Sequence, residues 1–522
     1  MDSVWLTARL RVSPVLRSVA ILIAVAGILF LALYNLTDYP LTWFDEGSHL
    51  HVPKALVRFG VYADYSSEGL RYYGPTIGVG PTVMLPIAAV FKVFGIGLLQ
   101  ARLVMALYLL AAIYGFYRLA FTLGGCRLAW AVTALVVSST GIIEYGRQVL
   151  GEVPGLFFVV AGFGLWLSAW EKASGRRLVL VGALLGLAMV TKHQYLLILA
   201  PTLALAWLAN LLYYRVAPQR VFLVPGLIAA ACLALWQIYL ILYLGPSTAS
   251  ENLEMLRQQA AGAAFAFSPK LMRESVKYLL SLSVYLGMLF PVLFYGSVLS
   301  LPRHREGQRW GVVLLFVLTN LLWYIFASIG WPRYAFPGLT MASFFVADFF
   351  HRLTDGFTIE WTSLWETLRG KRSDLQKYAF RWAMLLWFAI MVARPLVYNV
   401  RRIVAPPLNT PAAMAAYLDA HVPHDTLIET FEPEMGFLTD HNYHFAPTEV
   451  LHQGVRYVWL NGPPPSESYD FVQKEKPDYV LIGPLARWIN LYPADVLADH
   501  YRPVVRFEAG DSPVYELYKS QR

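Results

Sequence analysis

Residues 76–97 have the sequence TIGVGPTVMLPIAAVFKVFGIG, and whether this run crosses a membrane decides the topology of the chain. A helix needs about 20 apolar residues to cross the hydrocarbon core, so the run is long enough. However, Pro81 and Pro86 each remove a helix hydrogen-bond donor, and Gly78 and Gly80 weaken the start of a helix. The run alone therefore leaves both topologies open.

Basic residues in the other loops decide between the two topologies. If residues 76–97 do not cross, every loop with clustered Lys and Arg falls on the cytoplasmic side, as the positive-inside rule requires. If the run does cross, all of these loops lie outside. We therefore predict that residues 38–97 form one large external loop with membrane-associated helices. The basic loops carry Arg118 and Arg127; Lys172, Arg176 and Arg177; Arg215 and Arg220; Arg303, Arg305 and Arg309; and Arg369, Lys371, Arg372 and Lys377.

The composition is that of a multi-pass membrane protein. Of the 522 residues, 57% are hydrophobic and 15% are charged, which excludes an ordinary soluble domain and a disordered chain. A first apolar run at about 19–36 follows several arginines and lacks a cleavage site, so we expect it to be retained with its N-terminal end inside. We predict an all-α membrane body over residues 1–404. Its ten further spans are centred near residues 110, 136, 162, 185, 203, 232, 288, 319, 343 and 391, which gives eleven in total.

The composition changes near residue 405, where the apolar runs end. Strand-like runs at 426–430, 479–483 and 514–518 alternate with helical or turn-rich segments, and a helix is expected to begin at a capping Thr410. We predict a small α/β domain over residues 405–522. The number of spans places this domain on the extracytoplasmic side. On the inner surface, Trp361 and Trp365 predict a helix that lies along the membrane.

Several classes of function are not supported by the sequence. The net charge of +8 is accounted for by the cytoplasmic loops, so no nucleic-acid partner is expected. The motif GxxxxGK[ST] and a DxD tripeptide are both missing, which argues against ATP-driven transport and a soluble type of nucleotide-sugar site. The two cysteines offer no metal-ligand spacing and no redox pair. Gly182-x3-Gly186 is interpreted as a helix-packing contact.

Ionisable residues at the membrane edge are the main candidates for chemistry, because burying them is unfavourable. Asp45 and Glu46 follow the first span and offer a general base beside a second acid; the alternative is two solvated acids at a helix end. His49 and His51 lie two residues apart and would point to different faces of a helix. We interpret them as structural histidines.

Three short external turns carry the other candidates. One contains Glu144, Arg147 and Glu152, and its alternative role is interfacial anchoring. A lone Lys192 lies in a tight hairpin, and Arg333 precedes Tyr334 in a third turn. Both cations suit a phosphate, although either could instead contact lipid headgroups. Acids and bases gathered on one face indicate a phosphorylated, lipid-bound substrate.

These residues, in this order, resemble the GT-C glycosyltransferases, in particular the protein O-mannosyltransferase and aminoarabinose transferase branch. The resemblance covers roughly residues 15–345. It departs from that branch at residues 80–86, where GPTVMLP replaces Lys-Pro-Pro-Leu, and at Glu152, where Asp is commoner; both leave the substrate and metal dependence open. The features that carry it are the Asp45-Glu46 pair, the Pro-containing run 76–97, the turn from Arg147 to Glu152, the run GLAMVTK at 186–192, and Arg333-Tyr334-x2-Pro337.

The resemblance implies transfer of a sugar from a polyprenyl-phosphate carrier to a protein, lipid or polysaccharide acceptor, with inversion, on the outer face of the cell (inner or plasma) membrane. By position, Asp45 matches the catalytic acid, Glu46 its neighbour and Glu152 the acid of the second loop. Lys192 and Arg333 match basic positions near the donor phosphate, and we add Arg147 and Tyr334 to that predicted site. A divalent cation, Mg²⁺ or Mn²⁺, would be held by Glu46 and Glu152.

Two other hypotheses for the function remain open at this point. A transporter or flippase of lipid-linked sugars would also need external charges and a lipid groove, but it often shows inverted repeats, and none is evident. A polytopic receptor with an external ligand-binding domain would make the charged loops incidental. Release of lipid phosphate from a labelled donor would distinguish the enzyme from both.

Overall fold

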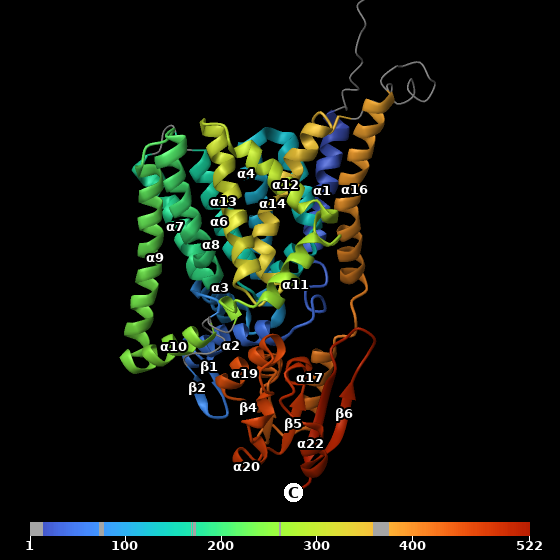
Figure 1. The fold of residues 1–522 in the computed structure, drawn as a ribbon. Coiled ribbons are helices and arrows are strands. Elements are labelled where there is room, and N and C mark those ends of the chain that lie inside the picture. Colours follow the sequence, from blue (N-terminus) through green and yellow to red (C-terminus); the bar gives the residue numbers. More distant parts are fainter. Residues whose placement is uncertain (1–13, 72–77, 169, 171–173, 260–262, 359–374) are drawn as a thin grey trace, which may run out of the picture.

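The computed structural model describes residues 14–71, 78–168, 170, 174–259, 263–358 and 375–522. It consists of a helical bundle and, at one end of it, a sheet with helices built from the C-terminal residues (Figure 1). Short helices lie between these two layers. The surface helix predicted around Trp361 and Trp365 lies outside the described residues.

The bundle is built from long apolar helices that run roughly parallel in Figure 1. Each predicted span centre lies within one of them, except residue 288, which immediately precedes α12. Helix α4 contains two of the centres, and it is kinked at Gly124 and Gly125, where Gly125 has φ +80°. The helices are α1 (Pro14–Leu33), α4 (Leu98–Ser138), α6 (Glu152–Leu167), α7 (Gly175–Thr191), α8 (His193–Ala209) with η2 (Asn210–Tyr214), α9 (Arg220–Leu244), α12 (Leu289–Ser300), α13 (Arg305–Phe326), α14 (Pro332–Leu353) and α16 (Leu375–Val404).

Five of the described helices are long and apolar enough to cross a membrane by themselves. Helices α5 and α6 meet at 111° and would give a sixth span as a bent pair. Eleven spans therefore remain a prediction. The five are Leu98–Ser138, His193–Tyr214, Arg220–Leu244, Arg305–Phe326 and Tyr378–Val404.

Shorter elements lie at the end of the bundle that faces the C-terminal sheet. Among them α3, from the run that decides the topology, has 14 residues. It is about 21 Å long, which is short for a hydrocarbon core of about 30 Å. These elements are α2 (Phe44–Phe59), β1 (Asp64–Ser66), β2 (Gly69–Arg71), α3 (Pro81–Phe94), α5 (Thr140–Arg147), α10 (Pro246–Gln259), α11 (Pro269–Leu280) and η4 (Tyr285–Gly287).

Small residues allow close helix packing, as predicted for Gly182 and Gly186. A Cβ atom at Gly182 would lie 2.7 Å from the carbonyl oxygen of Pro225, and one at Gly186 would lie 2.6 Å from Cβ of Cys232. Both contacts join α7 to α9. The interpretation of this pair as a packing contact is confirmed.

The C-terminal residues form a five-stranded sheet in the order β4-β3-β5-β7-β6, with β4, β3 and β5 parallel and the other pairs antiparallel. The three predicted strand runs coincide with β3, β5 and β7. The strands are β3 (Leu427–Thr430), β4 (Asn442–Phe445), β5 (Tyr479–Ile482), β6 (Tyr501–Phe507) and β7 (Tyr515–Ser520). The helices are α17 (Thr410–His421), α18 (Pro433–Leu438), α19 (Thr448–Leu460), η5 (Pro465–Glu467), α20 (Phe471–Lys474), α21 (Pro484–Trp488) and α22 (Ala494–His500).

The cap of α17 differs from the prediction by one residue. Asn409, not Thr410, caps the helix, and its side chain accepts a hydrogen bond from the Ala412 backbone at 3.2 Å. The Thr410 hydroxyl instead donates to the carbonyl of Pro513 at 2.7 Å. Both residue types can cap a helix, so the neighbouring β7 segment decides which one does.

Helix α2 joins the bundle to the C-terminal layer. Lys54 Nζ donates to three carbonyl oxygens at the end of α18 or just after it, at 2.7 to 3.2 Å. A cation at this position also complements the helix dipole. The backbones approach closely, because a Cβ at Gly47 would lie 2.2 Å from the backbone nitrogen of Glu434. These contacts therefore hold the C-terminal layer against α2, the helix that carries Asp45.

Candidate active site

Four of the predicted residues meet in one ionic cluster where the bundle faces the C-terminal layer. Arg333 Nη1 donates to Asp45 Oδ2, and Arg333 Nε donates to Glu152 Oε1. Lys192 Nζ donates to the same Glu152 oxygen. The cluster thus alternates two acids and two bases that are far apart in the sequence.

Helix ends place each of these side chains. Asp45 and Glu152 lie in the first turns of α2 and α6, where a carboxylate is favoured by the helix dipole. Arg333 lies in the first turn of α14, directly after Pro332. Lys192 separates α7 from α8, and its backbone pairs with Val79 in an isolated bridge. The start of the 76–97 run therefore supports the site directly.

The four side chains of the cluster differ in their exposure to solvent. The Glu152 side chain is fully buried, that of Arg333 is 5% exposed and that of Lys192 is 13% exposed, whereas Asp45 is 27% exposed. Asp45 is therefore the acid most accessible to a substrate. Burial, together with Arg333, lowers the pKa of Lys192 to about 8.

A cavity of about 540 Å³ opens onto Asp45, Lys192 and Arg333. Part of its wall comes from α2 and α14 and part from α19 and α21 of the C-terminal layer. Four tryptophans line it in a row: Trp43, Trp331, Trp459 and Trp488. Successive ring centroids are 5.9, 6.0 and 4.9 Å apart. The cavity therefore combines a charged end with broad aromatic faces, which suits an amphipathic ligand.

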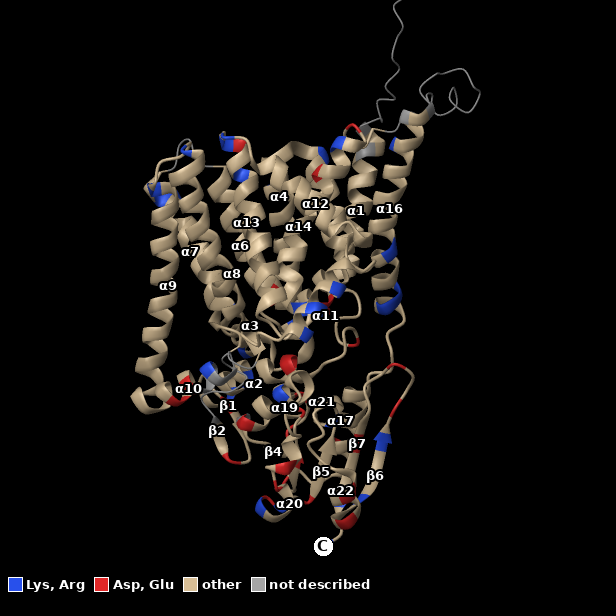
Figure 2. Ribbon diagram, in the orientation of Figure 1, with Lys and Arg blue, Asp and Glu red and all other residues tan. Residues whose placement is uncertain are grey.

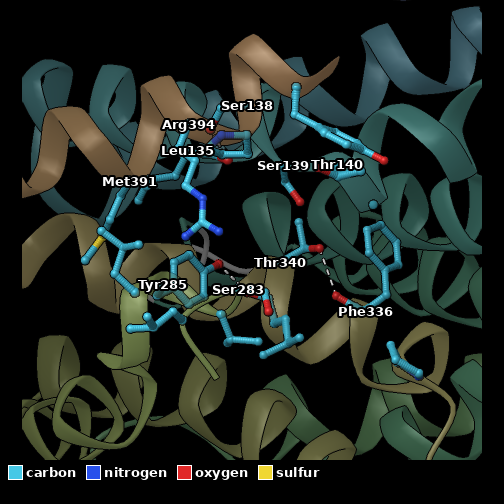
Figure 3. A pocket seen from close by; sticks show the side chains of 18 of the residues that line it. Leu135, Ser138, Ser139, Thr140, Ser283, Tyr285, Phe336, Thr340, Met391 and Arg394 are labelled. Atoms are coloured by element: carbon cyan, nitrogen blue, oxygen red, sulfur yellow. Dashed lines mark hydrogen bonds between the residues drawn. The ribbon is translucent and has the colours of Figure 1, made fainter. Parts of the chain in front are cut away.

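A second cavity, of about 530 Å³, lies on the other side of Tyr145 and Phe336. It is lined by α4, α5, α14, α16 and residues 282–286, and Arg394 of α16 points into it (Figure 3). The ring of Tyr145, which lines this cavity, also lies 6.0 Å from the Arg333 guanidinium. Tyr145 therefore connects the wall of the second cavity to the ionic cluster.

Glu46 is positioned differently from its neighbour Asp45. Its side chain is fully buried against Arg102, whose Nε and Nη2 donate to the two carboxylate oxygens at 2.9 and 2.5 Å. The backbone N–H of Val149 adds a third bond at 3.0 Å. This arrangement favours a structural role for Glu46 over the predicted catalytic and metal-binding roles.

Arg147 also has a structural position. It is fully buried and donates to backbone carbonyls of Leu31, Tyr34, Asn35 and Tyr39 at 2.5 to 3.1 Å. These bonds hold the end of α1 and the segment that follows it, and none of them is made to a residue of the ionic cluster. The predicted role in binding the donor phosphate therefore receives no support.

The remaining predicted residues have clear positions. Tyr334 lines the 540 Å³ cavity beside Arg333, and its backbone carbonyl accepts a bond from Gln194 at 2.8 Å. His49 Nδ1 donates to the carbonyl of Val149 at 2.8 Å, and burial lowers the pKa of this histidine to about 4. His51 is buried between Asp64 and α18. His49 also lines the 540 Å³ cavity beside Asp45, so a purely structural role for it remains a prediction.

A cation shared by Glu46 and Glu152 does not fit this arrangement. Both Glu46 oxygens already accept bonds from Arg102, and Glu152 Oε1 faces two bases. Glu152 Oε2 is buried and has no hydrogen-bond partner among the described residues. A single oxygen beside two positive side chains is a poor site for Mg²⁺ or Mn²⁺.

Sequence reasoning missed the C-terminal contribution to the site. Glu432 lines the 540 Å³ cavity, and its Oε1 accepts from the backbone N–H groups of Leu485 and Ala486 at 3.0 and 2.9 Å. Burial, with Glu434 nearby, raises the pKa of Glu432. Trp43 and Trp331 each lie two residues before a predicted site residue, Asp45 and Arg333. No local pattern indicates that Glu432 or Trp459 reaches the bundle.

Comparisons with known proteins concern the fold of the chain and the sequence of one part of it. A family described as dolichyl-phosphate-mannose-protein mannosyltransferase matches residues 79–239. The structure is similar to that of ArnT from Cupriavidus metallidurans bound to undecaprenyl phosphate, with a TM-score of 0.63, 14% identity, and coverage of 96% of this chain and 98% of that one. It is also similar to the oligosaccharyltransferase AglB from Archaeoglobus fulgidus in complex with an inhibitory peptide and a dolichol-phosphate, with a TM-score of 0.56, 14% identity, and coverage of 97% and 74%. Among curated proteins, none matches by sequence.

Proposed function

From the GT-C fold of this multi-pass membrane chain, we propose that it is a glycosyltransferase that moves a sugar from a polyprenyl-phosphate carrier to an acceptor on the extracytoplasmic face, with inversion. The observation that carries this proposal is the cluster of Asp45, Arg333, Glu152 and Lys192 at the 540 Å³ cavity. It combines an accessible base with two cations suited to a phosphate.

Asp45 would act as the general base. Its side chain is the most exposed acid of the cluster and lines the cavity. It would take the proton of an acceptor hydroxyl as that oxygen attacks the anomeric carbon of the donor sugar. The bond between the anomeric carbon and the phosphate oxygen breaks at the same time, and its electron pair leaves with the polyprenyl phosphate. Attack on the face opposite the leaving group inverts the anomeric centre.

Arg333 and Lys192 would stabilise the departing phosphate, on which negative charge grows as the bond breaks. The Arg333 guanidinium lies 5.5 Å from the Trp43 ring and 5.7 Å from the Trp331 ring, measured to the ring centroids, so its plane is held at the cavity wall. Glu152 accepts hydrogen bonds from both bases and would position them. Its full burial leaves it no access to an acceptor.

The distribution of charge supports an extracytoplasmic site. In Figure 2, Lys and Arg residues lie at the end of the bundle away from the C-terminal sheet, near the upper ends of α9 and α13, and others lie at α11 and the lower part of α16. By the positive-inside rule, the basic loops at the upper end would make that end cytoplasmic. The ionic cluster and the C-terminal layer, at the other end, would then face outward, where sugars are available on lipid carriers.

The test uses purified full-length protein in detergent with polyprenyl-phosphate sugars labelled in the sugar and, separately, in the phosphate. The proposal expects lipid phosphate to be released together with a glycosylated acceptor, and expects Asp45→Asn to slow the formation of both products at least about 100-fold. Movement of intact donor across vesicle membranes without any release of lipid phosphate would favour the flippase alternative and overturn the enzyme proposal.

A further inference from the structure

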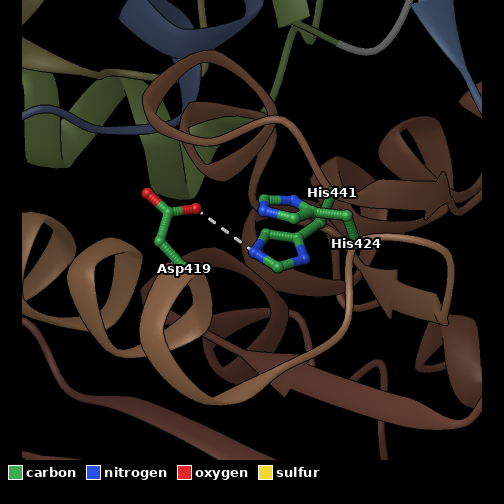
Figure 4. Close-up of side chains that lie close together, drawn as sticks. All are labelled: Asp419, His424 and His441. Carbon is green, nitrogen blue, oxygen red and sulfur yellow. Dashed lines mark ion pairs between the residues drawn. The ribbon is translucent and has the colours of Figure 1, made fainter.

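Two histidines and an aspartate lie close together in the C-terminal layer, away from the candidate active site. Asp419 is near the end of α17, His424 is in the turn between α17 and β3, and His441 immediately precedes β4. One potential ligand atom from each residue lies within 4.8 Å of the others. Asp419 Oδ1 lies 3.3 Å from His441 Nε2. Figure 4 shows a nitrogen of each ring on the side that faces the Asp419 carboxylate.

His441 is the strongest sign of a ligand at this cluster. The residue is only 7% exposed; its Nε2 faces Asp419 Oδ1 at 3.3 Å, and its Nδ1 makes no hydrogen bond with any described residue. A buried polar group without a partner is unfavourable by about 1–3 kcal/mol. A ligand that takes up a ring nitrogen would remove this penalty.

The two rings are arranged to act together. The His424 and His441 rings stack with centroids 4.3 Å apart and planes 21° from parallel. A neutral imidazole keeps a free electron pair on one nitrogen, which is the form that binds a metal.

We propose that Asp419, His424 and His441 bind a Zn²⁺ ion. Two imidazole nitrogens and one carboxylate oxygen are a donor set that Zn²⁺ accepts, with a fourth position left for water. Mg²⁺ and Ca²⁺ prefer oxygen ligands and fit less well. In a tetrahedral site with bonds of about 2.1 Å, ligand atoms are about 3.4 Å apart, close to the separation of Asp419 and His441. His424 is exposed in a turn and can close the remaining gap.

The surroundings of the cluster support this site. His441 follows Asp440, which pairs with Lys54 at 2.8 Å and with Arg58 at 2.7 Å, so the chain before β4 is held from the side of α2. A cavity of about 270 Å³ borders both histidines and gives room for the ion and its water. The ion would tie the end of α17 to the segment that α2 anchors. This inference is independent of the proposed glycosyl transfer.

The test measures Zn²⁺ binding to purified full-length protein that has been treated with a chelator and dialysed. Isothermal titration and elemental analysis should both give one Zn²⁺ per chain, and Zn²⁺ should raise the unfolding temperature. Asp419→Ala and His424→Ala remove exposed side chains and should leave the fold intact. Each should weaken Zn²⁺ binding at least about 10-fold and abolish the stabilisation, the lower end of what perturbing a metal site does.

Two variants serve as controls. His500→Ala removes an exposed histidine at the end of α22 and should bind Zn²⁺ like the unaltered protein. Asp45→Asn alters the ionic cluster and should also leave binding unchanged. The inference is overturned if binding does not saturate, if neither Asp419→Ala nor His424→Ala weakens it, or if Asp45→Asn removes it.

Discussion

Arg333 is the residue that joins the parts of the candidate active site. Its guanidinium donates to Asp45 through one nitrogen and to Glu152 through another. A planar fork with several fixed donors can make both contacts and still present an edge to a phosphate, whereas a lysine offers one point charge. Substitutions at this position therefore separate charge from geometry.

Arg333→Ala should reduce transfer by about 100- to 1000-fold, the scale for loss of one electrostatic donor in a transition state. Arg333→Lys should impair activity less, because it keeps the charge but loses the second contact. Initial rates with varied donor should show the loss in kcat as well as KM, since negative charge grows on the phosphate as the sugar leaves. Near-normal kinetics of a folded Arg333→Ala protein would leave Lys192 as the phosphate ligand.

Asp45→Asn keeps the shape of the side chain but removes the base. Transfer should fall by at least about 100-fold, the usual scale for loss of a general base. Thermal unfolding should change little, because the side chain is partly exposed at a helix start. A folded Asp45→Asn protein with near-normal turnover would exclude Asp45 as the base.

The dependence of kcat/KM on pH should show the titration of Lys192. Its pKa of about 8 lies below the ordinary value for lysine, so the side chain loses its proton as the pH rises through that value. If the positive charge is needed to bind the donor phosphate, kcat/KM for the donor should fall above about pH 8. Lys192→Arg should move this fall to higher pH, because arginine stays protonated. An unchanged alkaline limb in Lys192→Arg would assign the titration to another group.

The four residues of the cluster could be found in the sequence because each places a charge in a short turn beside apolar runs. A charged side chain at such a position is unfavourable unless it has a function. Glu46 and Arg147 satisfy the same criterion, yet their partners are Arg102 and backbone carbonyls at the end of α1 and just after it. Those partners are set by tertiary packing. Local sequence therefore cannot separate structural from functional charges.

At the scale of elements, the contact between α2 and α18 determines where the C-terminal layer lies. Lys54 is 1% exposed and holds the end of α18 through three carbonyl bonds and Asp440. Arg58 pairs with the same aspartate from a more exposed position. The two basic residues thus offer a matched pair of substitutions.

Lys54→Met should destabilise the protein by about 2–4 kcal/mol, because it leaves buried carbonyls unpaired. Arg58→Met should change stability by less than about 1 kcal/mol, as expected for an exposed ion pair. Denaturant unfolding in detergent, followed by tryptophan fluorescence, would measure both. Equal effects of the two substitutions would argue against Lys54 as the anchor.

Strand β5 is a continuous apolar run (Tyr479-Val-Leu-Ile482), and β3 and β7 each begin with apolar residues, so all three could be predicted. Strand β4 instead begins with Asn442 and contains a histidine (Asn442-Tyr-His-Phe445). Strand β6 is an edge strand with Pro503 beside an irregularity in its pairing. A proline within a run argues against a strand in a prediction from sequence, although an edge strand tolerates a proline.

At the scale of the whole molecule, the resemblance to GT-C glycosyltransferases is confirmed by the family match and by the fold. Hydropathy and charge predicted the helical body, since both are properties of the sequence. The fit of the C-terminal layer over the ionic cluster depends on contacts between distant segments, such as Glu432 at the cavity. The number of spans and the orientation remain predictions.

Cysteine labelling tests the orientation. In a chain with Cys126 and Cys232 replaced by Ala, Ser67→Cys and Ser466→Cys should react with an impermeant reagent on intact cells, because both are placed outside. Glu306→Cys, in the first turn of α13 at the basic end, should react only after lysis. Protection of Ser67→Cys and Ser466→Cys, with labelling of Glu306→Cys, would reverse the predicted topology.

The bond between Arg333 and Asp45 also implies a compulsory order of substrate binding. An acceptor that arrives first would find one carboxylate oxygen of Asp45 already occupied by a hydrogen bond from the Arg333 guanidinium. A donor phosphate would draw the guanidinium onto its own oxygens and free that oxygen of Asp45 to accept the proton of the acceptor. The leaving group would thereby switch on the base that its own departure requires, so steady-state kinetics should show the donor as the leading substrate.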